Sequence, residues 1–326
     1  MKVTNEMMNQ EIRTFGRLIR FTDLFYGEKN LRIIQKIAGW ILNNKLVKIK
    51  VGESYYCKRS HDDSELRILV MRPEKPKKNV PGILWLHGGG YAIGAPETVA
   101  ITIPRKMMEI SDCVVVSPEY RLSINSPYPA ALEDAYDALL WMKDHAEELG
   151  IDDTHLIVGG ESAGGGLAAA LCLYARDKKE VAISFQMPLY PMLDDRMDSE
   201  SEIDNDAPVW NIKSNRIAWR MYLGDRFETD DVPAYAAPAR TMNYSDLPPA
   251  VTFVGSLEPF RDETISYFEN LQKAGIPAFI KVYDGCYHTF ESMQPNAAVS
   301  RDAVAFVLEK YKHAIEFYSA QQPSFR

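Results

Sequence analysis

The sequence predicts an α/β fold, in which helices cover both faces of a mostly parallel eight-stranded sheet and a helical cap lies above the strand ends. Three observations lead to this prediction. Short apolar runs alternate with longer helical runs over most of the chain, as strands and their connecting helices do. The 326 residues are 46% hydrophobic, enough to bury one large core. Two glycine-rich motifs each follow an apolar run, at the strand ends where α/β sheets place their chemistry.

Residues 1–47 are predicted to form two amphipathic cap helices. One apolar stripe contains Phe15, Leu18 and Ile19, and a more regular stripe runs at helical spacing through Ile34, Ile37, Ala38, Ile41 and Leu42. From Lys48 to Arg72 the pattern changes to strand-like runs, which predict an antiparallel hairpin at the start of the sheet.

The remaining strands and helices follow in alternation. Six further strands are predicted at residues 82–86, 113–117, 156–158, 183–189, 251–254 and 278–283. The accompanying helices are predicted at residues 97–110, 130–149, 163–176, 262–274 and about 297–314. The last strand is expected at a sheet edge, where it is a candidate for pairing two copies across a two-fold axis in a homodimer.

The interval of about 194–248 interrupts this alternation. It is too long for a structureless connection, and it contains a helical run with Ser214 at a predicted N-cap and Gly224 just past the predicted end. We therefore expect an inserted cap segment that packs with the N-terminal helices. The alternative is an ordinary surface excursion.

The composition restricts the partners and the location. A net charge of −8 and a pI near 5.4 argue against a nucleic-acid partner, which usually requires a basic face. The four cysteines form no CxxC pair, which indicates neither a zinc site nor a disulfide framework. We find no signal-peptide pattern and no apolar stretch long enough to span a membrane, and therefore expect a cytoplasmic protein.

The motif Gly160-Glu161-Ser162-Ala163-Gly164 predicts a nucleophilic serine. Its context is more specific than the pattern itself, because the motif follows an apolar strand and small residues open the helix after it. Such a strand-to-helix turn exposes the serine hydroxyl at the sheet edge. The alternative role for Ser162 is a helix N-cap in a glycine turn.

A nucleophilic serine needs a base and an orienting carboxylate. Among six histidines, His288 is favoured because it lies in a loop just beyond the last predicted strand. The carboxylates that follow strand ends between Ser162 and His288 are Asp194, Asp195, Glu258 and Asp262. Glu258 is best placed, in a short turn after a strand, whereas Asp262 falls in the first turn of a helix, where the helix dipole alone favours an acid.

The run His87-Gly88-Gly89-Gly90 predicts an oxyanion-binding loop. Three glycines allow two backbone N–H groups to point inward without obstruction, and Ala163, which follows the serine, offers a third. The alternative is a flexible turn. We expect His87 to brace this loop rather than bind a metal, and no metal site is predicted.

The ordered motifs resemble the hormone-sensitive-lipase-like carboxylesterases of the α/β-hydrolase superfamily. The resemblance covers residues 65–315 and rests on six motifs: residues 87–90, 117–122, 128–134, 160–166, 255–262 and 288–290. It implies a catalytic α/β-hydrolase domain at 48–326 with a cap insertion at about 194–248, and no cofactor. It also implies Gly88, Gly89 and Ala163 as the oxyanion donors. The sequence departs from the family at Glu258, where aspartate is usual.

These observations predict a serine carboxylesterase that hydrolyses short- to medium-chain esters of small molecules through an acyl-serine intermediate. Four aromatic residues are candidates for the substrate pocket, although cap-core packing is an alternative role: Tyr91, Trp210, Trp219 and Tyr222. An amidase, formamidase or peptidase would use the same residues. A non-catalytic ligand receptor on this fold is a third possibility, but it would not need both Ser162 and His288.

Overall fold

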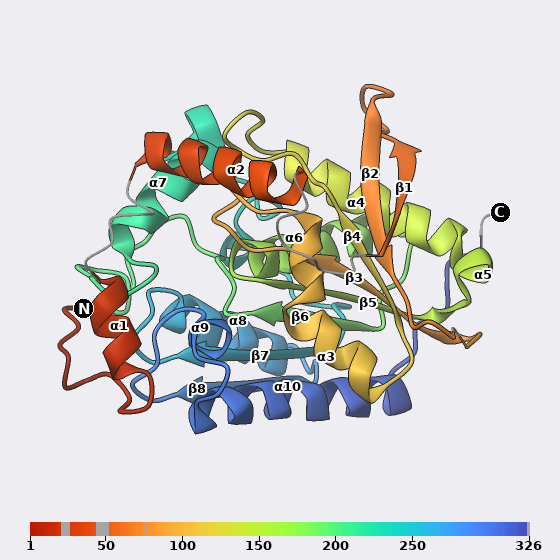
Figure 1. The fold of residues 1–326 in the computed structure, drawn as a ribbon. Coiled ribbons are helices and arrows are strands. Elements are labelled where there is room, and N and C mark those ends of the chain that lie inside the picture. The colour runs from red at the N-terminus through yellow and green to blue at the C-terminus, as the bar shows by residue number, and fades with distance from the viewer. Residues whose placement is uncertain (21–26, 44–51, 76, 325–326) are drawn as a thin grey trace.

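The computed structural model describes residues 1–20, 27–43, 52–75 and 77–324, and its centre is an eight-stranded sheet (Figure 1). The strands are β1 (Glu53–Lys58), β2 (Glu65–Met71), β3 (Val80–Leu86), β4 (Val114–Pro118), β5 (Ile151–Glu161), β6 (Phe185–Leu189), β7 (Ala250–Gly255) and β8 (Ala278–Tyr283). Their spatial order is β1-β2-β4-β3-β5-β6-β7-β8, and only the pairs β1–β2 and β2–β4 are antiparallel. The predicted fold is confirmed, including the initial hairpin and β8 at an edge.

Helices cover both faces of this sheet. They are α1 (Arg13–Ile19), α2 (Glu28–Asn43), α3 (Ile103–Ile110), α4 (Ala130–Asp144), α5 (Ala146–Leu149), α6 (Ala163–Lys178), α7 (Ile212–Leu223), α8 (Arg261–Lys273), α9 (Phe290–Met293) and α10 (Ala298–Phe317). Three short 3₁₀ helices are η1 (Pro96–Ala100), η2 (Gly224–Arg226) and η3 (Pro238–Arg240). The core on one face includes residues of α4, α6 and α8, and the core on the other includes residues of α3 and α10.

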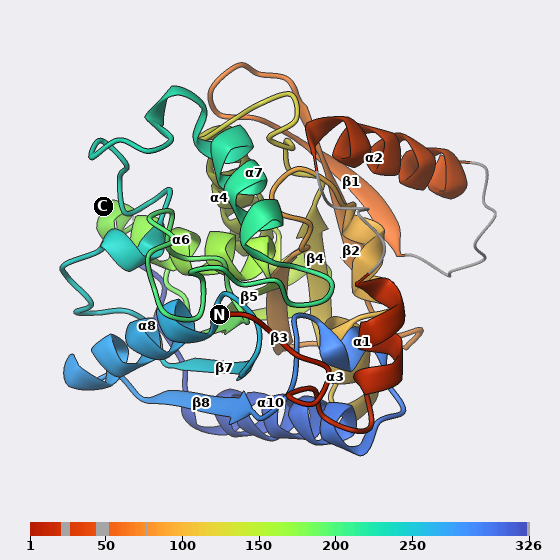
Figure 2. The ribbon, with the colours of Figure 1, turned by 90° about the vertical axis from the view of Figure 1, so that its left-hand side faces the viewer.

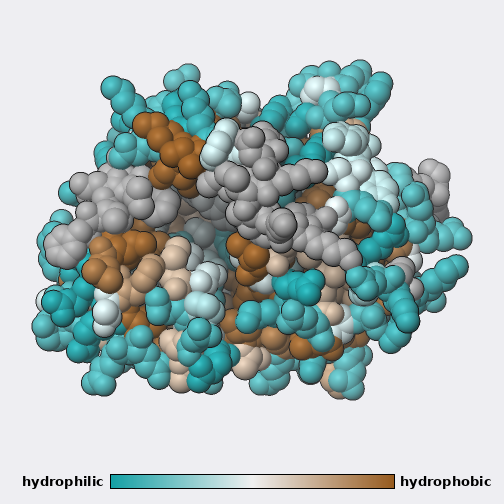
Figure 3. Space-filling model, in the orientation of Figure 1, coloured by the Kyte–Doolittle hydropathy of each residue, from teal (hydrophilic) through white to brown (hydrophobic). Residues whose placement is uncertain are grey.

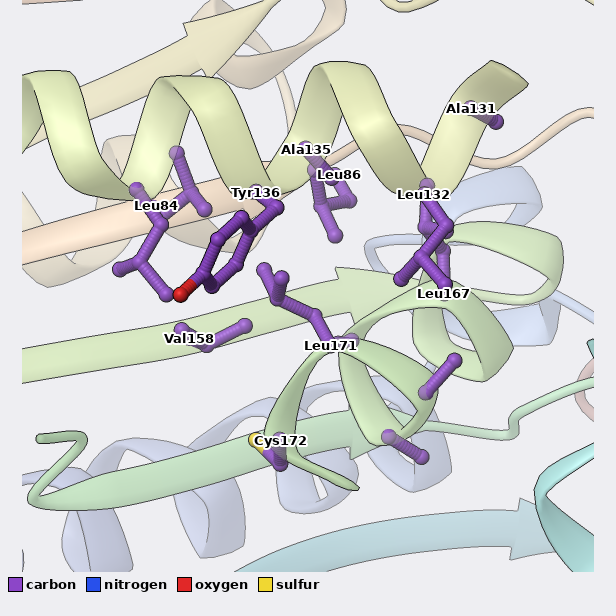
Figure 4. Packing of buried hydrophobic residues seen from close by; sticks show 14 of the residues in the cluster. Leu84, Leu86, Ala131, Leu132, Ala135, Tyr136, Val158, Leu167, Leu171 and Cys172 are labelled. Carbon is purple, nitrogen blue, oxygen red and sulfur yellow. The ribbon is translucent and has the colours of Figure 1, made fainter. Parts of the chain in front are cut away.

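The central strand β3 shows how one sequence supplies both cores. Leu84 and Leu86 belong to the core on the α4 and α6 side, whereas Ile83 and Trp85 belong to the core on the α3 and α10 side. This division follows from the two-residue period of a strand. Figure 4 shows Leu84 and Leu86 packed between α4 and α6, near Val158 of β5. Because both faces are covered, the strand is a continuous apolar run rather than an alternating one.

Two predicted helices are interrupted. The helix expected at 97–110 is divided into η1 and α3, with Pro104 in the first turn of α3. Proline lacks an N–H and disfavours helical geometry in the residue before it, so a helix begins there more readily than it continues. The helix expected at 130–149 is divided at His145, whose φ of −104° and ψ of 13° lie outside the helical region.

The segment predicted as a cap insertion contains α7, which lies with α2 toward the top of Figure 2 and contributes to a small core shared with that helix. Leu31 of α2, Ala92 and Ile124 form a small core with Ile217 and Met221 of α7. This core lies beside the loops that follow β3 and β4.

The predicted N-cap of α7 is wrong. Asn211 occupies that position, and its side chain accepts hydrogen bonds from the backbone N–H groups of Lys213 and Ser214. Ser214 is the third residue of the helix. Gly224 directly follows α7, as the sequence predicted, and has a φ of 58°.

The N-terminal segment packs against the loop that follows β8. Asn9 N donates to the Gly285 carbonyl oxygen at 2.8 Å, and the Tyr287 hydroxyl donates to the Ile12 carbonyl oxygen at 3.1 Å. A side chain at Gly16 of α1 would meet the Tyr287 ring at 2.8 Å. The beginning of the chain therefore supports the loop that carries His288.

Candidate active site

Ser162 lies at the turn between β5 and α6. Its φ of 58° and ψ of −121° are unusual for a residue with a side chain and indicate a sharp strand-to-helix turn. A Cβ atom at Gly160 would collide with the Gly164 carbonyl oxygen, and one at Gly164 would collide with that of Leu86. Glycine is therefore required on both sides of the serine by close backbone packing.

In the structure, Ser162, His288 and Glu258 form a hydrogen-bonded triad. His288 Nε2 is 2.9 Å from Ser162 Oγ, and His288 Nδ1 is 2.5 Å from Glu258 Oε2. The backbone N–H of Gly255 donates to Glu258 Oε1 at 2.7 Å. The side chains are buried, with exposed fractions of 5% for Ser162, 2% for His288 and 0% for Glu258. Water competes little for these hydrogen bonds, so each is stronger than it would be at the surface.

The other carboxylates that the sequence left open are engaged elsewhere. Each forms an ion pair: Asp194 with Arg196, Asp195 with Arg240, and Asp262 with Arg261. Asp262 also accepts the backbone N–H of Ser201 at 2.8 Å. Of the four candidates, Glu258 is the one hydrogen-bonded to His288. Its side chain is one methylene longer than that of aspartate, and it reaches His288 Nδ1 from this position.

The glycine loop after β3 lies against the serine turn. A Cβ atom at Gly88 would be 2.9 Å from the Glu161 carbonyl oxygen and 3.4 Å from Ser162 Cβ. Gly89 has φ of 120°, a conformation that favours glycine. Neither Gly88 nor Gly89 donates its N–H in a hydrogen bond to another described residue. Ala163 N–H, at the first position of α6, belongs to the four donors that a helix leaves without an intrahelical acceptor.

His87 braces this loop from behind. Its Nδ1 is 2.8 Å from the Gly88 carbonyl oxygen, and its ring stacks on Tyr120 with centroids 4.2 Å apart. The Tyr120 hydroxyl donates to the His87 carbonyl oxygen at 2.7 Å. Burial lowers the pKa of His87 to about 4, against a smaller raising effect of the Gly88 carbonyl. The neutral ring therefore donates its Nδ1–H to Gly88, in keeping with the bracing role expected from the sequence.

A second contact to the loop comes from α2 and was missed by the sequence analysis. Gln35 Nε2 donates to the Gly94 carbonyl oxygen at 3.1 Å, and Gly94 N donates to Gln35 Oε1 at 2.8 Å. Gly94 lies against the His87 ring, where a Cβ atom would collide with Nδ1. Gln35 gave no sequence signal, because its position over the loop depends on the packing of α2.

Two buried glutamates near His288 were also missed. The Tyr190 hydroxyl donates to Glu291 Oε1 at 2.7 Å, and the Tyr190 ring meets the His288 ring edge-on at 5.2 Å. Burial, assisted by the nearby charge of Glu291, raises the pKa of Glu161 to about 8. Burial also raises the pKa of Glu291. The proximity of Glu291 to His288 along the chain was the one signal that could have drawn attention to it.

The four aromatic residues considered for a pocket are all buried. Trp210 is nearest to the site: its ring centroid is 6.3 Å from that of His288, and a side chain at Gly90 would meet its ring at 2.5 Å. Tyr91 stacks on Tyr222 of α7 at 3.8 Å, and Trp219 lies 6.2 Å from Tyr91. Trp210 therefore borders the histidine, and the other three form an aromatic cluster behind the glycine loop.

The described residues contain no group of three or more His, Cys, Asp or Glu side chains placed to hold a metal ion. In the same part of the chain, no helix is long and apolar enough to cross a membrane.

Comparison with known proteins agrees with the fold described above. A family model described as the alpha/beta hydrolase fold matches residues 83–292. The chain is 39% identical to "Esterase LipI" of Mycobacterium tuberculosis over 60% of its length and 61% of that protein, less than two thirds of the relative. It is 30% identical to "Arylesterase" of Saccharolobus solfataricus, covering 87% of this chain and 92% of the relative. Among solved structures, "Bacterial Heroin Esterase" superposes with a TM-score of 0.87 at 31% identity, covering 96% and 99% of the two chains.

Proposed function

This chain belongs to the α/β-hydrolase family whose model matches residues 83–292, and we propose that it hydrolyses short- to medium-chain esters through an acyl intermediate on Ser162. It is a carboxylic ester hydrolase, as are the relatives that span most of its length. The observation that carries the proposal is the buried, hydrogen-bonded triad of Ser162, His288 and Glu258.

In the first step Ser162 attacks the ester carbonyl carbon. His288 Nε2 accepts the hydroxyl proton as the carbon–oxygen bond forms. Glu258 Oε2 accepts a hydrogen bond from His288 Nδ1–H, which keeps Nε2 free to act as the base and stabilises the imidazolium that results. The 2.5 Å and 2.9 Å separations support these roles.

The tetrahedral intermediate places a negative charge on the former carbonyl oxygen. We propose that the N–H groups of Gly88, Gly89 and Ala163 bind this oxygen. Two observations support this assignment. Gly88 lies close to Ser162, and the N–H groups of Gly88 and Gly89 have no hydrogen-bond acceptor among the described residues. Donors fixed before the reaction stabilise the charge without reorganisation.

In the remaining steps His288 acts alternately as an acid and as a base. The imidazolium Nε2–H gives its proton to the alcohol oxygen as the ester C–O bond breaks, and the alcohol leaves. Water then transfers a proton to Nε2 and attacks the acyl carbon. Return of that proton to Ser162 Oγ releases the carboxylic acid and the free serine.

We propose that Tyr91, Trp210, Trp219 and Tyr222 shape the space for the substrate, Trp210 most directly. Its place between His288 and Gly90 supports contact with a bound acyl or alcohol group. Bulky aromatic walls favour small and medium substrates.

The proposal is tested with p-nitrophenyl esters of increasing acyl length and with matched anilides. We expect the highest kcat/KM for short to medium acyl groups, and a loss of about 10⁴-fold or more in Ser162→Ala. Anilide turnover equal to ester turnover would indicate an amidase. Absence of turnover with every ester would instead favour a ligand receptor.

We further propose a cytoplasmic homodimer that pairs through the exposed edge of β8. The four cysteines are free in the structure, which is consistent with a reducing compartment. β8 pairs with β7 on one side, and Val282 is 42% exposed. Light scattering after gel filtration should give about twice the monomer mass of 37.0 kDa. Cell fractionation tests the location.

A further inference from the structure

One face of α2 carries apolar and basic side chains toward solvent. The outer face of α2 consists of Lys29, Ile33, Lys36, Ile37 and Trp40, which fall within about 100° of arc on a helix of 3.6 residues per turn. Ile33, Ile37 and Trp40 are 55%, 53% and 60% exposed, and both lysines are exposed. Figure 3 shows brown side chains gathered over α2 at the upper left of the molecule, beside hydrophilic ones.

The opposite face of the same helix is fixed to the protein. Leu31 is buried in the small core with α7 residues, and Arg32 Nη2 donates to the Ile124 carbonyl oxygen at 2.6 Å. Gln35 makes its two hydrogen bonds to Gly94. The outer face is thus directed to solvent by contacts on the inner face, and its isoleucines have no role in the core.

The N-terminal part of the chain is basic although the whole chain is acidic. Its first 50 residues contain ten Lys and Arg against four Asp and Glu, within a chain of net charge −8. Part of this charge is used within the structure, because Lys2 and Arg20 pair with Asp206 and Arg32 pairs with Glu28. Lys29 and Lys36 are exposed on the outer face of α2, where their charge suits a negatively charged partner.

We propose that the outer face of α2 binds the surface of a bilayer that contains anionic phospholipid. A tryptophan and two isoleucines insert between headgroups and acyl chains, while Lys29 and Lys36 extend their ammonium groups to the lipid phosphates. The helix lies in the plane of the interface and does not span the membrane. This binding does not depend on the proposed chemistry, and it would bring the cap of the enzyme to membrane-dissolved esters.

The charges favour a bilayer over a second copy of the chain. In a two-fold dimer through this face, Lys29 and Lys36 of one copy would face those of the other. None of the five residues of this face is acidic, so the like charges would repel. An anionic bilayer is complementary to the lysines and to the apolar stripe at once.

Vesicle flotation of the full-length protein tests this proposal. We expect the wild type to float with equimolar phosphatidylglycerol and phosphatidylcholine vesicles, and the double variant Ile33→Asp/Ile37→Asp to partition about tenfold or more weakly. Lys29→Glu/Lys36→Glu should lose the preference for the anionic vesicles over pure phosphatidylcholine. Phe317→Asp, at a site 63% exposed at the end of α10, is the matched control and should bind as the wild type does.

Tryptophan fluorescence locates the contact. Trp40 is 60% exposed, whereas Trp85, Trp141, Trp210 and Trp219 are at most 8% exposed, so aqueous acrylamide quenches mainly Trp40. Vesicles should protect this signal, and Trp40→Phe should remove it.

The proposal is overturned if the wild type does not bind anionic vesicles, or if the aspartate variant binds as well as the wild type. It is also overturned if that variant turns a dimeric wild type into a monomer, because a second copy would then cover the face. All variants should keep wild-type turnover of a soluble ester, which separates this test from that of the catalytic proposal.

Discussion

The side chain of Gln35 binds the backbone of Gly94 in both directions. Its Nε2 donates to the Gly94 carbonyl oxygen at 3.1 Å, and its Oε1 accepts the Gly94 N–H at 2.8 Å. Gly94 in turn lies against His87, whose Nδ1 is 2.8 Å from the Gly88 carbonyl oxygen. Helix α2 is therefore joined to the loop that carries two of the proposed oxyanion donors.

Gln35→Ala should lower kcat on a soluble ester by about tenfold, with a smaller change in KM. Loosening the loop misplaces its donors more than it weakens substrate binding, and the complete loss of one donor costs about 10²- to 10³-fold. Steady-state kinetics of Lys36→Ala, a change on the exposed face of the same helix, provides the control. A kcat equal to that of the wild type would show that the loop holds its geometry without α2.

Glu258→Gln should lower kcat/KM by about 10³- to 10⁴-fold while leaving the fold intact. The amide keeps the size of the side chain but no longer requires the proton of His288 to reside on Nδ1. Asp262→Asn and Asp194→Asn are matched changes at carboxylates paired with arginines, and each should stay within about tenfold of the wild type. A larger loss at either aspartate would contradict the role of Glu258.

Glu161→Gln should stabilise the protein, and by more as the pH rises. Burial raises the pKa of Glu161 from 4.5 to about 8, so the folded state retains a proton that the unfolded chain has released between these values. The wild type therefore loses stability from this group as the pH rises toward 8. Thermal melts should show the Gln variant gaining about 1 kcal/mol or more relative to the wild type between acidic and mildly alkaline pH.

Glu200→Gln, at an exposed position, controls for the loss of one negative charge and should show no such trend. A constant difference between Glu161→Gln and the wild type across the pH range would show that Glu161 ionises alike in both states.

Asn211→Ala should destabilise the protein by about 1 kcal/mol, because it removes the side-chain acceptor at the start of α7. Ser214→Ala should be nearly neutral, since the Ser214 hydroxyl is buried and has no hydrogen-bond partner among the described residues. Urea unfolding of the two variants compares them directly. The reverse order of stabilities would restore Ser214 as the cap.

The hydrogen-bonded triad could be predicted from the sequence because each of its residues lies close to a strand end. Ser162 directly follows β5, Glu258 is three residues after β7, and His288 is five residues after β8. Parallel strands bring their carboxyl ends to one edge, so residues far apart in the chain can be placed together from local patterns alone. Glu258 was chosen over Asp262 because it lies in the short turn after the strand, whereas Asp262 falls in the first turn of the next helix.

Other features depend on contacts that no local pattern contains. Both Asn211 and Ser214 are good N-cap residues, and only the geometry of the entering chain decides which side chain reaches the free N–H groups. The contact of Gln35 with Gly94 joins residues 59 positions apart, and that of Tyr190 with Glu291 joins residues 101 positions apart. Such contacts follow from tertiary packing, which the sequence alone did not provide.

The most direct test of the central claim is covalent labelling with a fluorophosphonate, followed by peptide mass spectrometry of the modified residue. The proposed mechanism predicts one label on Ser162, no label in Ser162→Ala, and labelling slowed by about 10³-fold or more in His288→Ala, because the base activates the serine. A label on another residue, or labelling of Ser162 at an unchanged rate without His288, would contradict it.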